Sequence, residues 1–143
     1  MALRVVLDTN VWISAALSPN GPPAAIVRRL LARGVPVLTQ ATFDELCTRL
    51  AKPKFDRWLG QDLRQKLLRD LDAAALWVTV PDSMAATAWS RDRSDDAFVH
   101  AALVSGAAWL VSGNADLLAI MQPPPGLRIV TPAEALVQLP LGA

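Results

Sequence analysis

Short apolar runs alternate with longer segments of helical spacing along this chain. Residues 3–7, LRVVL, are mostly apolar and partly β-branched, which is typical of a strand covered on both faces. Similar runs predict strands at residues 35–39, 76–80, 109–112 and 127–130. Apolar residues that recur every three or four positions predict helices at 10–17, 24–33, 42–51, 62–75, 84–89, 95–105 and 116–121, and a capping sequence starts a last helix after Thr131.

The alternation of strands and helices predicts one kind of fold. Strands that each lead into a helix form a parallel sheet with right-handed crossovers and helices on both faces. We therefore expect a three-layer α/β/α fold with a central, mostly parallel sheet of four to five strands. The length of 143 residues suits a single domain, so residues 1–143 are expected to fold as one unit.

Amino-acid composition disfavours disulfide-stabilised, zinc-binding and membrane-spanning classes of protein. One cysteine, Cys47, excludes an internal disulfide framework, and one histidine, His100, excludes a zinc site built from several His and Cys ligands. Apolar runs stay well below the roughly 18 residues needed to span a membrane, and the N-terminal segment lacks the pattern of a secretion signal. We expect a soluble, cytoplasmic protein with no membrane partner. Its formal net charge of +1 gives no broad attraction to nucleic acid, so such a partner must be held locally.

Four acidic residues fall where the predicted strands end. Asp8 directly follows the first strand, Glu45 lies near the start of the helix after the second, Asp96 lies at the start of the helix at 95–105, and Asp116 lies just beyond the fourth strand. Ligands of open parallel sheets bind at this carboxyl edge. Carboxylates gathered there repel one another unless a cation neutralises them, and ligation by oxygen alone favours Mg²⁺ or Mn²⁺. The sequence therefore predicts an acidic metal site.

Each of these carboxylates also has an ordinary structural explanation. Asp8 suits the cap of the helix that follows it, and Glu45 suits the acidic position of a capping box. Asp96, its neighbour Asp95, and Asp116 suit the first turn of a helix, where negative charge is favourable. An aspartate directly after a buried strand commonly faces a ligand site, so Asp8 is the strongest candidate on local grounds.

The four acidic positions lie in recurring sequence contexts. These are Val5-Val-Leu-Asp8-Thr9-Asn10-Val-Trp-Ile-Ser-Ala, Phe43-Asp-Glu45-Leu, Ser94-Asp-Asp96-Ala-Phe98-Val-His-Ala-Ala102, and Leu110-Val-Ser112-Gly113-Asn114-Ala-Asp116-Leu117-Leu118. Each context is weak alone, but together and in this order they resemble the PIN domain, a family of metal-dependent ribonucleases that includes many toxins of bacterial toxin/antitoxin pairs. The resemblance covers nearly the whole chain, and segments 18–22 and 51–55 resemble its toxin-type branch.

The resemblance implies a metal-dependent endoribonuclease, of the toxin type, that hydrolyses phosphodiester bonds of single-stranded RNA. It assigns Asp8, Glu45, Asp96 and Asp116 as the catalytic and metal-binding residues, with Thr9, Asn10, Ser112 and Asn114 in support. Close relatives often carry Asp where this chain has Asn114, which removes one charge, so one firmly held ion is expected rather than two. Asp92 and Asp95 are the reserve candidates.

Basic and aromatic residues after the second acidic position are candidates for RNA binding. The basic residues are Arg49, Lys52, Lys54 and Arg57, and Phe55 or Trp58 would stack on a base. The ordinary explanations are a solvated basic face and aromatic packing in the core. Resemblance to the family further implies a homodimer and a small antitoxin protein that covers the acidic groove.

Other functions agree less well with the sequence. Phospho-aspartate enzymes and receiver domains also place Asp after the first strand, but they use a lysine near a later strand, and this chain has no lysine after Lys66. A dinucleotide site needs a glycine-rich loop where Asp8-Thr9-Asn10 stands. A degenerate PIN-like module that binds RNA or protein without cutting remains an alternative, because Asn114 removes one charge.

Overall fold

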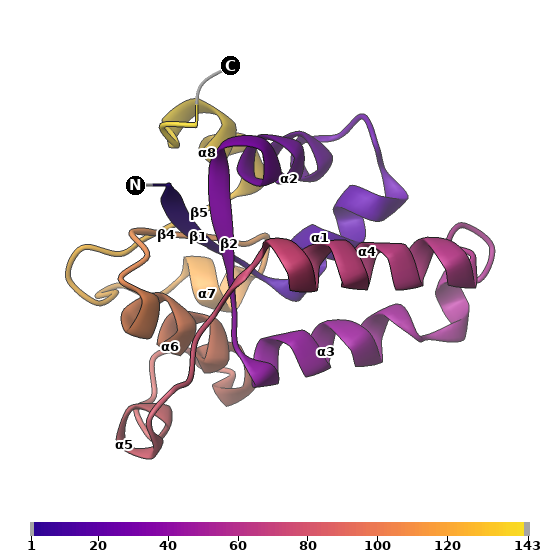
Figure 1. Ribbon diagram of the computed structural model, residues 1–143. Coiled ribbons are helices and arrows are strands. Elements are labelled where there is room, and N and C mark those ends of the chain that lie inside the picture. Colours follow the sequence, from indigo (N-terminus) through magenta and orange to yellow (C-terminus); the bar gives the residue numbers. More distant parts are fainter. Residues whose placement is uncertain (1, 142–143) are drawn as a thin grey trace.

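A parallel five-stranded sheet forms the centre of the computed structural model, which describes residues 2–141 (Figure 1). The strands are β1 (Leu3–Leu7), β2 (Gly34–Leu38), β3 (Leu76–Trp77), β4 (Trp109–Val111) and β5 (Arg128–Val130). The helices are α1 (Thr9–Leu17), α2 (Pro22–Arg33), α3 (Gln40–Leu50), α4 (Gln61–Ala74), α5 (Asp82–Ala85), α6 (Asp96–Ser105), α7 (Ala115–Leu118) and α8 (Pro132–Gln138), with short 3-10 turns η1 (Pro53–Phe55) and η2 (Arg93–Asp95). Every pair of neighbouring strands is parallel, as the alternation of elements predicted.

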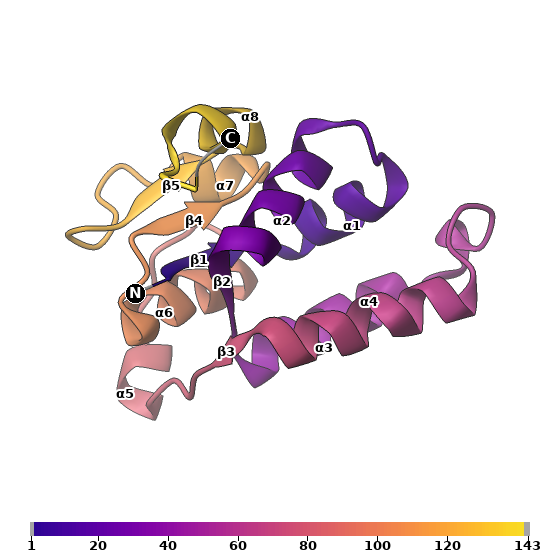
Figure 2. The same cartoon turned by 45° about the horizontal axis from the view of Figure 1, so that its top comes forward.

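Successive side chains of β1 point to opposite faces of the sheet and join two separate apolar cores. Val5 and Leu7 pack in the core that includes residues of α1, α2, α3 and α8, whereas Val6 packs with α6 and α7. The three-layer arrangement of helices, sheet and helices is therefore confirmed. In Figure 2, α3 and α4 extend together beyond the edge of the sheet and end at the turn around η1.

The strand order β3-β2-β1-β4-β5 creates a switch point between β1 and β4. From β1 the chain continues outward through β2 and β3, whereas β5 follows β4 on the other side. Crossovers that leave a sheet in opposite directions open a crevice at the carboxyl ends of the two central strands. Asp8 and Ser112, which directly follow β1 and β4, lie at this crevice.

Local sequence sets the ends of several helices. Thr39 caps α3, and its capping box is completed by the Thr42 side chain, so the capping box considered for Glu45 is not formed. The capping box predicted after Thr131 is confirmed at α8. Gly106 ends α6 with a φ of 72°, a left-handed conformation that glycine adopts without the steric cost of a Cβ atom.

Three predicted elements are longer than those observed or are displaced along the chain. The strand predicted at 76–80 covers only Leu76–Trp77, because it is an edge strand that pairs with β2 alone. The helix predicted at 84–89 is α5, Asp82–Ala85, and the helix predicted at 116–121 is the single turn of α7. Across residues 2–141, every helix is too short or too polar to cross a membrane.

Candidate functional site

Asp8 is held at the switch point by both of its carboxylate oxygens. It caps α1, where its Oδ1 accepts a hydrogen bond from the backbone N–H of Val11 at 3.1 Å, and its Oδ2 accepts from the hydroxyl of Ser112. Burial raises the pKa of the Asp8 carboxyl above its ordinary value, although the bonds from Ser112 and Val11 oppose this shift. The capping and pocket-facing interpretations of Asp8 are therefore compatible, since one carboxylate does both.

Glu45 projects from α3 toward the same place. The hydroxyl of Thr9 donates to its Oε2 at 2.8 Å, and the Nη2 of Arg49 lies 3.1 Å from its Oε1. A second nitrogen of Arg49, Nη1, donates to the side-chain oxygen of Asn10 at 2.9 Å. Arg49 therefore supplies a positive charge within the acidic site itself and ties α3 to the start of α1.

Asp95, a reserve candidate, lines this site as well. Its Oδ2 accepts a hydrogen bond of 2.9 Å from the side-chain amide of Asn114, which lies beyond β4. Burial and the neighbouring Asp92 carboxylate raise the pKa of Asp95 to about 6. Such a value marks a carboxylate that lacks a compensating positive charge, which is the condition in which it would gain most from a bound cation.

Asp96, which is grouped with Asp8 and Glu45 on the basis of sequence, is not among the residues that line a pocket with them and binds the preceding loop. Its Oδ1 accepts hydrogen bonds from the backbone N–H groups of Trp89 at 3.2 Å and Ser90 at 2.7 Å, and Arg93 Nε lies 3.4 Å from its Oδ2. The carboxylate is buried, with 2 % of its residue surface exposed. Asp96 therefore fastens the loop before η2 to the start of α6.

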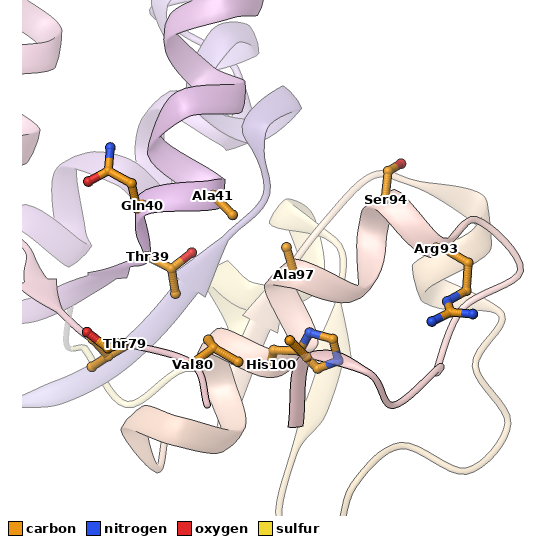
Figure 3. A pocket seen from close by; sticks show the side chains of 11 residues that line it. Thr39, Gln40, Ala41, Thr79, Val80, Arg93, Ser94, Ala97 and His100 are labelled. Carbon is orange, nitrogen blue, oxygen red and sulfur yellow. The ribbon is translucent and has the colours of Figure 1, made fainter. Parts of the chain in front are cut away.

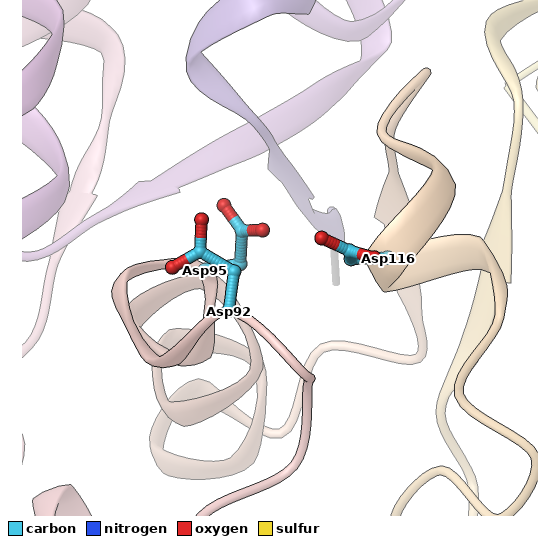
Figure 4. A group of neighbouring side chains, drawn as sticks. All are labelled: Asp92, Asp95 and Asp116. Carbon is cyan, nitrogen blue, oxygen red and sulfur yellow. The ribbon is translucent and has the colours of Figure 1, made fainter.

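Asp116 contributes to a second acidic group beside Asp95. One carboxylate oxygen from each of Asp92, Asp95 and Asp116 lies within 4.8 Å of the others, and Figure 4 shows the Asp116 side chain of α7 pointing toward Asp92 and Asp95 at η2. Asn114 positions this group, because its side-chain oxygen accepts from the backbone N–H of Asp116 at 2.8 Å while its amide nitrogen binds Asp95. Asn114 thus binds the Asp95 carboxylate directly and holds the backbone from which the Asp116 side chain projects.

A small pocket lies between these side chains and is called the acidic pocket below. Its lining residues are Asp8, Thr9, Asn10, Glu45, Arg49, Asp95, Phe98 and Asn114, and its volume is about 10 Å³. A space of this size holds about one water-sized particle. The donors are carboxylate, amide and hydroxyl oxygens, which suit a hard divalent cation such as Mg²⁺ or Mn²⁺ rather than a soft metal. The residues present therefore fit one such ion.

The other predicted basic residues lie elsewhere. Lys52, Lys54 and Arg57 follow α3 near η1, at the far end of that helix from α6 (Figure 1). Lys54 stacks over the ring of Phe55, with its Nζ 5.1 Å from the ring centre, and Arg57 stacks over Trp58 at 5.5 Å. Of the four basic candidates, only Arg49 lines the acidic pocket.

The sequence predicts Asp96 as a site residue and Asp95 only as a reserve candidate. Both aspartates lie at the start of the same helix, and nothing in the local sequence separates them. The signal that separates them is the contact between Asp95 and Asn114, which spans 19 positions and exists only once α6 and α7 lie side by side.

Comparisons with known proteins agree with the family resemblance and with the fold. A family model described as the PIN domain matches residues 4–116. The uncharacterized protein MJ1680 of Methanocaldococcus jannaschii is 29% identical over 119 residues, which cover 82% of this chain and 75% of that protein.

Several solved structures share the fold. VapBC2 from Rickettsia felis, bound to a DNA fragment from their promoter, matches 90% of this chain and 98% of its own chain with a TM-score of 0.62 and 14% identity. PAE2754 from Pyrobaculum aerophilum matches 96% of this chain and 89% of its own, with a TM-score of 0.62 and 17% identity. FitAB bound to the IR36 DNA fragment matches 90% of this chain and 94% of its own, with a TM-score of 0.57 and 19% identity. Identities this low show similarity of fold alone. The match of the family model over most of the sequence establishes that this chain belongs to the PIN-domain family.

Proposed function

We propose that this PIN-domain protein is a metal-dependent endoribonuclease that hydrolyses phosphodiester bonds of single-stranded RNA. The acidic pocket at the switch point of the sheet is the observation that carries the proposal, because carboxylates from four separate segments meet there and beside it. Membership of the PIN-domain family supports nuclease chemistry. We also propose that the protein is cytoplasmic, where it would meet RNA.

Four carboxylates are proposed to serve the reaction: Asp8, Glu45, Asp95 and Asp116. Asp95 takes the place assigned to Asp96 from the sequence, because it lines the acidic pocket whereas Asp96 binds the backbone of the preceding loop. A bound Mg²⁺ or Mn²⁺ would lower the pKa of a water molecule and offset the charge that grows on the phosphoryl oxygens. Asp8, Asp95 and Asp116, with Glu45, would hold that ion.

The neighbours of these carboxylates keep them in place. Ser112 binds Asp8, Thr9 binds Glu45, and Asn114 binds Asp95, so each of the three accepts a hydrogen bond from another segment. This arrangement keeps the carboxylates together before substrate arrives, which removes the need to reorganise them during the reaction. Arg49 is already 3.1 Å from Glu45 and is proposed to pair with the RNA phosphate when the carboxylate turns to the ion.

We further propose that the protein is the toxin of a toxin/antitoxin pair, that it forms a homodimer, and that a small antitoxin covers the acidic groove. Resemblance to the toxin-type branch of the family supports these partners. The similar chains in VapBC2 and FitAB come from structures that contain DNA, and they support the shared fold.

The test compares purified wild type with Asp8→Asn and Asp95→Asn on single-stranded RNA, with Mg²⁺, with Mn²⁺ and with a chelator. Asp62→Asn on the exposed side of α4 is the matched control, since it removes the same charge far from the pocket. Cleavage only by wild type and by the control, and only with metal, supports the proposal. Cleavage that survives both pocket substitutions or excess chelator would overturn it. Metal binding by folded wild type without cleavage would favour the interaction-module alternative.

A further inference from the structure

A large cavity adjoins the acidic pocket at the start of α6. Its volume is about 510 Å³, within the range of about 300–1,000 Å³ that is usual for sites of small organic ligands. Its lining residues come from the start of α3, the chain after β3, α5, and the continuous segment of η2 and α6, and several of them are labelled in Figure 3. The proposed hydrolysis of phosphodiester bonds does not by itself require a space of this size.

The walls of the cavity combine apolar surfaces with a few polar groups. Val78, Val80 and Ala97 of α6 are apolar lining residues, and Figure 3 shows Val80 and Ala97 among them. Gln40 and Thr79 add an amide and a hydroxyl to the lining. Apolar side chains against its faces and hydrogen-bonding groups at its edges are what an unstacked nucleobase needs in a protein.

His100 gives the cavity a buried polar group of defined orientation. Its Nε2 lies 2.8 Å from the backbone carbonyl oxygen of Thr87. Because a carbonyl oxygen can only accept, Nε2 carries the hydrogen, and in the neutral tautomer Nδ1 is left as an acceptor. Among residues 2–141 no hydrogen bond to this Nδ1 is formed, although His100 is only 5 % exposed. The ring can therefore accept a hydrogen bond from a donor inside the cavity.

Ser94 connects the cavity to the carboxylate group of Asp92, Asp95 and Asp116. Ser94 lines the cavity, and its hydroxyl donates to Asp92 at 2.7 Å, while Asp92 lies in the group with Asp95 and Asp116. Arg93 also lines the cavity, and its side chain is 66 % exposed. A strand of RNA bound at the carboxylate group would therefore have Arg93 and the cavity available to a neighbouring nucleotide.

We propose that this cavity, called the base cavity below, receives one nucleobase of single-stranded RNA next to the phosphate that is cleaved. The inference rests on the proposed nuclease function and adds a specificity site to it. Val78, Val80 and Ala97 pack against the faces of the base, and His100 accepts a hydrogen bond from its edge. Arg93 pairs with the phosphate that links this base to its neighbour.

Binding measurements under chelation test the base cavity without cleavage. The probes are fluorescent hexamers of A, C, G and U and a hexamer with the same ribose-phosphate backbone but no bases. We expect at least one base-containing hexamer to bind wild type about tenfold more tightly than the abasic one, the scale of one stacked base. Ala97→Leu fills the cavity from α6 and should reduce this difference to less than about twofold. Ala85→Leu fills it from α5 and serves as a second, independent variant.

Ala133→Leu in α8 is the matched control, because it adds the same side chain at an exposed position on a helix that packs in the other apolar core. It should keep the full difference between base-containing and abasic RNA. The proposal is overturned if both filling variants keep that difference, or if wild type shows none. Filling variants that lose binding of an apolar dye, while their preference for bases is unchanged, would assign the cavity to an apolar ligand instead.

Cleavage measured on the same variants separates this inference from the proposed function. If wild type and Ala97→Leu cut RNA with the same base preference, the nuclease function stands and the base cavity is excluded. If binding depends on the bases and on Ala97 but no cleavage occurs with Mg²⁺ or Mn²⁺, the base cavity stands and the nuclease function fails.

Discussion

At the start of α6, two neighbouring regions of this protein are built in opposite ways. The acidic pocket has a volume of about 10 Å³, and the base cavity beside it has a volume of about 510 Å³. Hydrogen bonds between segments fix the carboxylates of the acidic pocket, such as those from Ser112 to Asp8 and from Asn114 to Asp95. The base cavity is mostly apolar, and His100 there has an acceptor nitrogen left for a ligand.

This difference between the acidic pocket and the base cavity indicates that the two regions have different functions. A tight cluster of carboxylates can hold an ion and position a phosphate, but it presents the same groups to every nucleotide. A larger cavity with apolar walls and a few polar groups can distinguish one base from another. Rate should therefore depend on the acidic pocket, and preference for a base should depend on the base cavity.

The largest expected effect is a loss of kcat on substitution of Asp95, in contrast to a change of KM on substitution of Ala97, two positions along the chain. Asp95→Asn should lower kcat for RNA cleavage at least about a hundredfold, because losing an ion-binding carboxylate costs no less than losing the groups that orient it. Ala97→Leu should act mainly on KM, with an increase of about tenfold for the preferred RNA. Steady-state kinetics on one RNA measures both. Equal losses of kcat in the two variants would break the comparison.

The next prediction contrasts the two adjacent aspartates. Asp96→Ala should lower the free energy of unfolding by about 2–3 kcal/mol, because it leaves the backbone N–H groups of Trp89 and Ser90 buried without an acceptor. Asp95→Ala should not destabilise the chelated protein at pH 7.5, since it removes a buried charge whose pKa is raised. Urea denaturation in chelator measures both values. A loss of stability in Asp95→Ala as large as that in Asp96→Ala would contradict this contrast.

The third prediction concerns pH. Burial and Asp92 raise the pKa of Asp95 to about 6, so below this pH an ion must displace a proton from the carboxyl group. Through Asp95 alone, affinity for Mn²⁺ should therefore fall about fivefold from pH 6 to pH 5. The raised pKa of Asp8, also caused by burial, adds to the fall. Calorimetric titration at several pH values measures it, and a flat profile would show that neither group holds the ion.

The raised pKa of Asp95 also determines how folding stability changes with pH when a chelator has removed metal ions. The folded protein holds the proton on Asp95 more tightly than the unfolded chain does, since the folded pKa is about 6 and the ordinary value is 3.8. This group therefore favours folding at low pH, and its contribution declines as the pH rises from about 4 to about 6. In Asp95→Asn that part of the decline should be missing, which thermal unfolding across this range will show.

The smallest effect concerns Arg49, the cation already within the acidic pocket. Arg49→Gln removes the charge that pairs with Glu45 and competes with an ion for it. Affinity for Mn²⁺ should rise about two- to fivefold, the scale of a partly exposed ion pair. Binding of RNA in chelator should weaken, because one phosphate contact is lost. Arg57→Gln, near η1, is the control and should leave the affinity for Mn²⁺ unchanged.

Much of the fold followed from the pattern of apolar residues. The strand at Leu3–Leu7 was predicted to the residue, and the parallel sheet followed from the alternation of strands and helices. The prediction at 76–80 was too long because β3 is an edge strand with one partner, and pairing, not local sequence, sets where such a strand ends. The cavity between α3, α5 and α6 left no signal in the sequence, since its walls come from four separate segments.

The sequence by itself determined which edge of the sheet carries the acidic residues. Parallel strands all end at the same edge, so an acidic residue just after a strand is placed there by the chain direction alone. Only the tertiary structure distinguishes the surroundings of Asp95 from those of Asp96, because Asn114, 19 positions away, binds Asp95, whereas the preceding loop at Ser90 folds back to bind Asp96. Adjacent residues differ in direction by about 100° at the start of a helix, and the surrounding segments determine which of them meets the pocket.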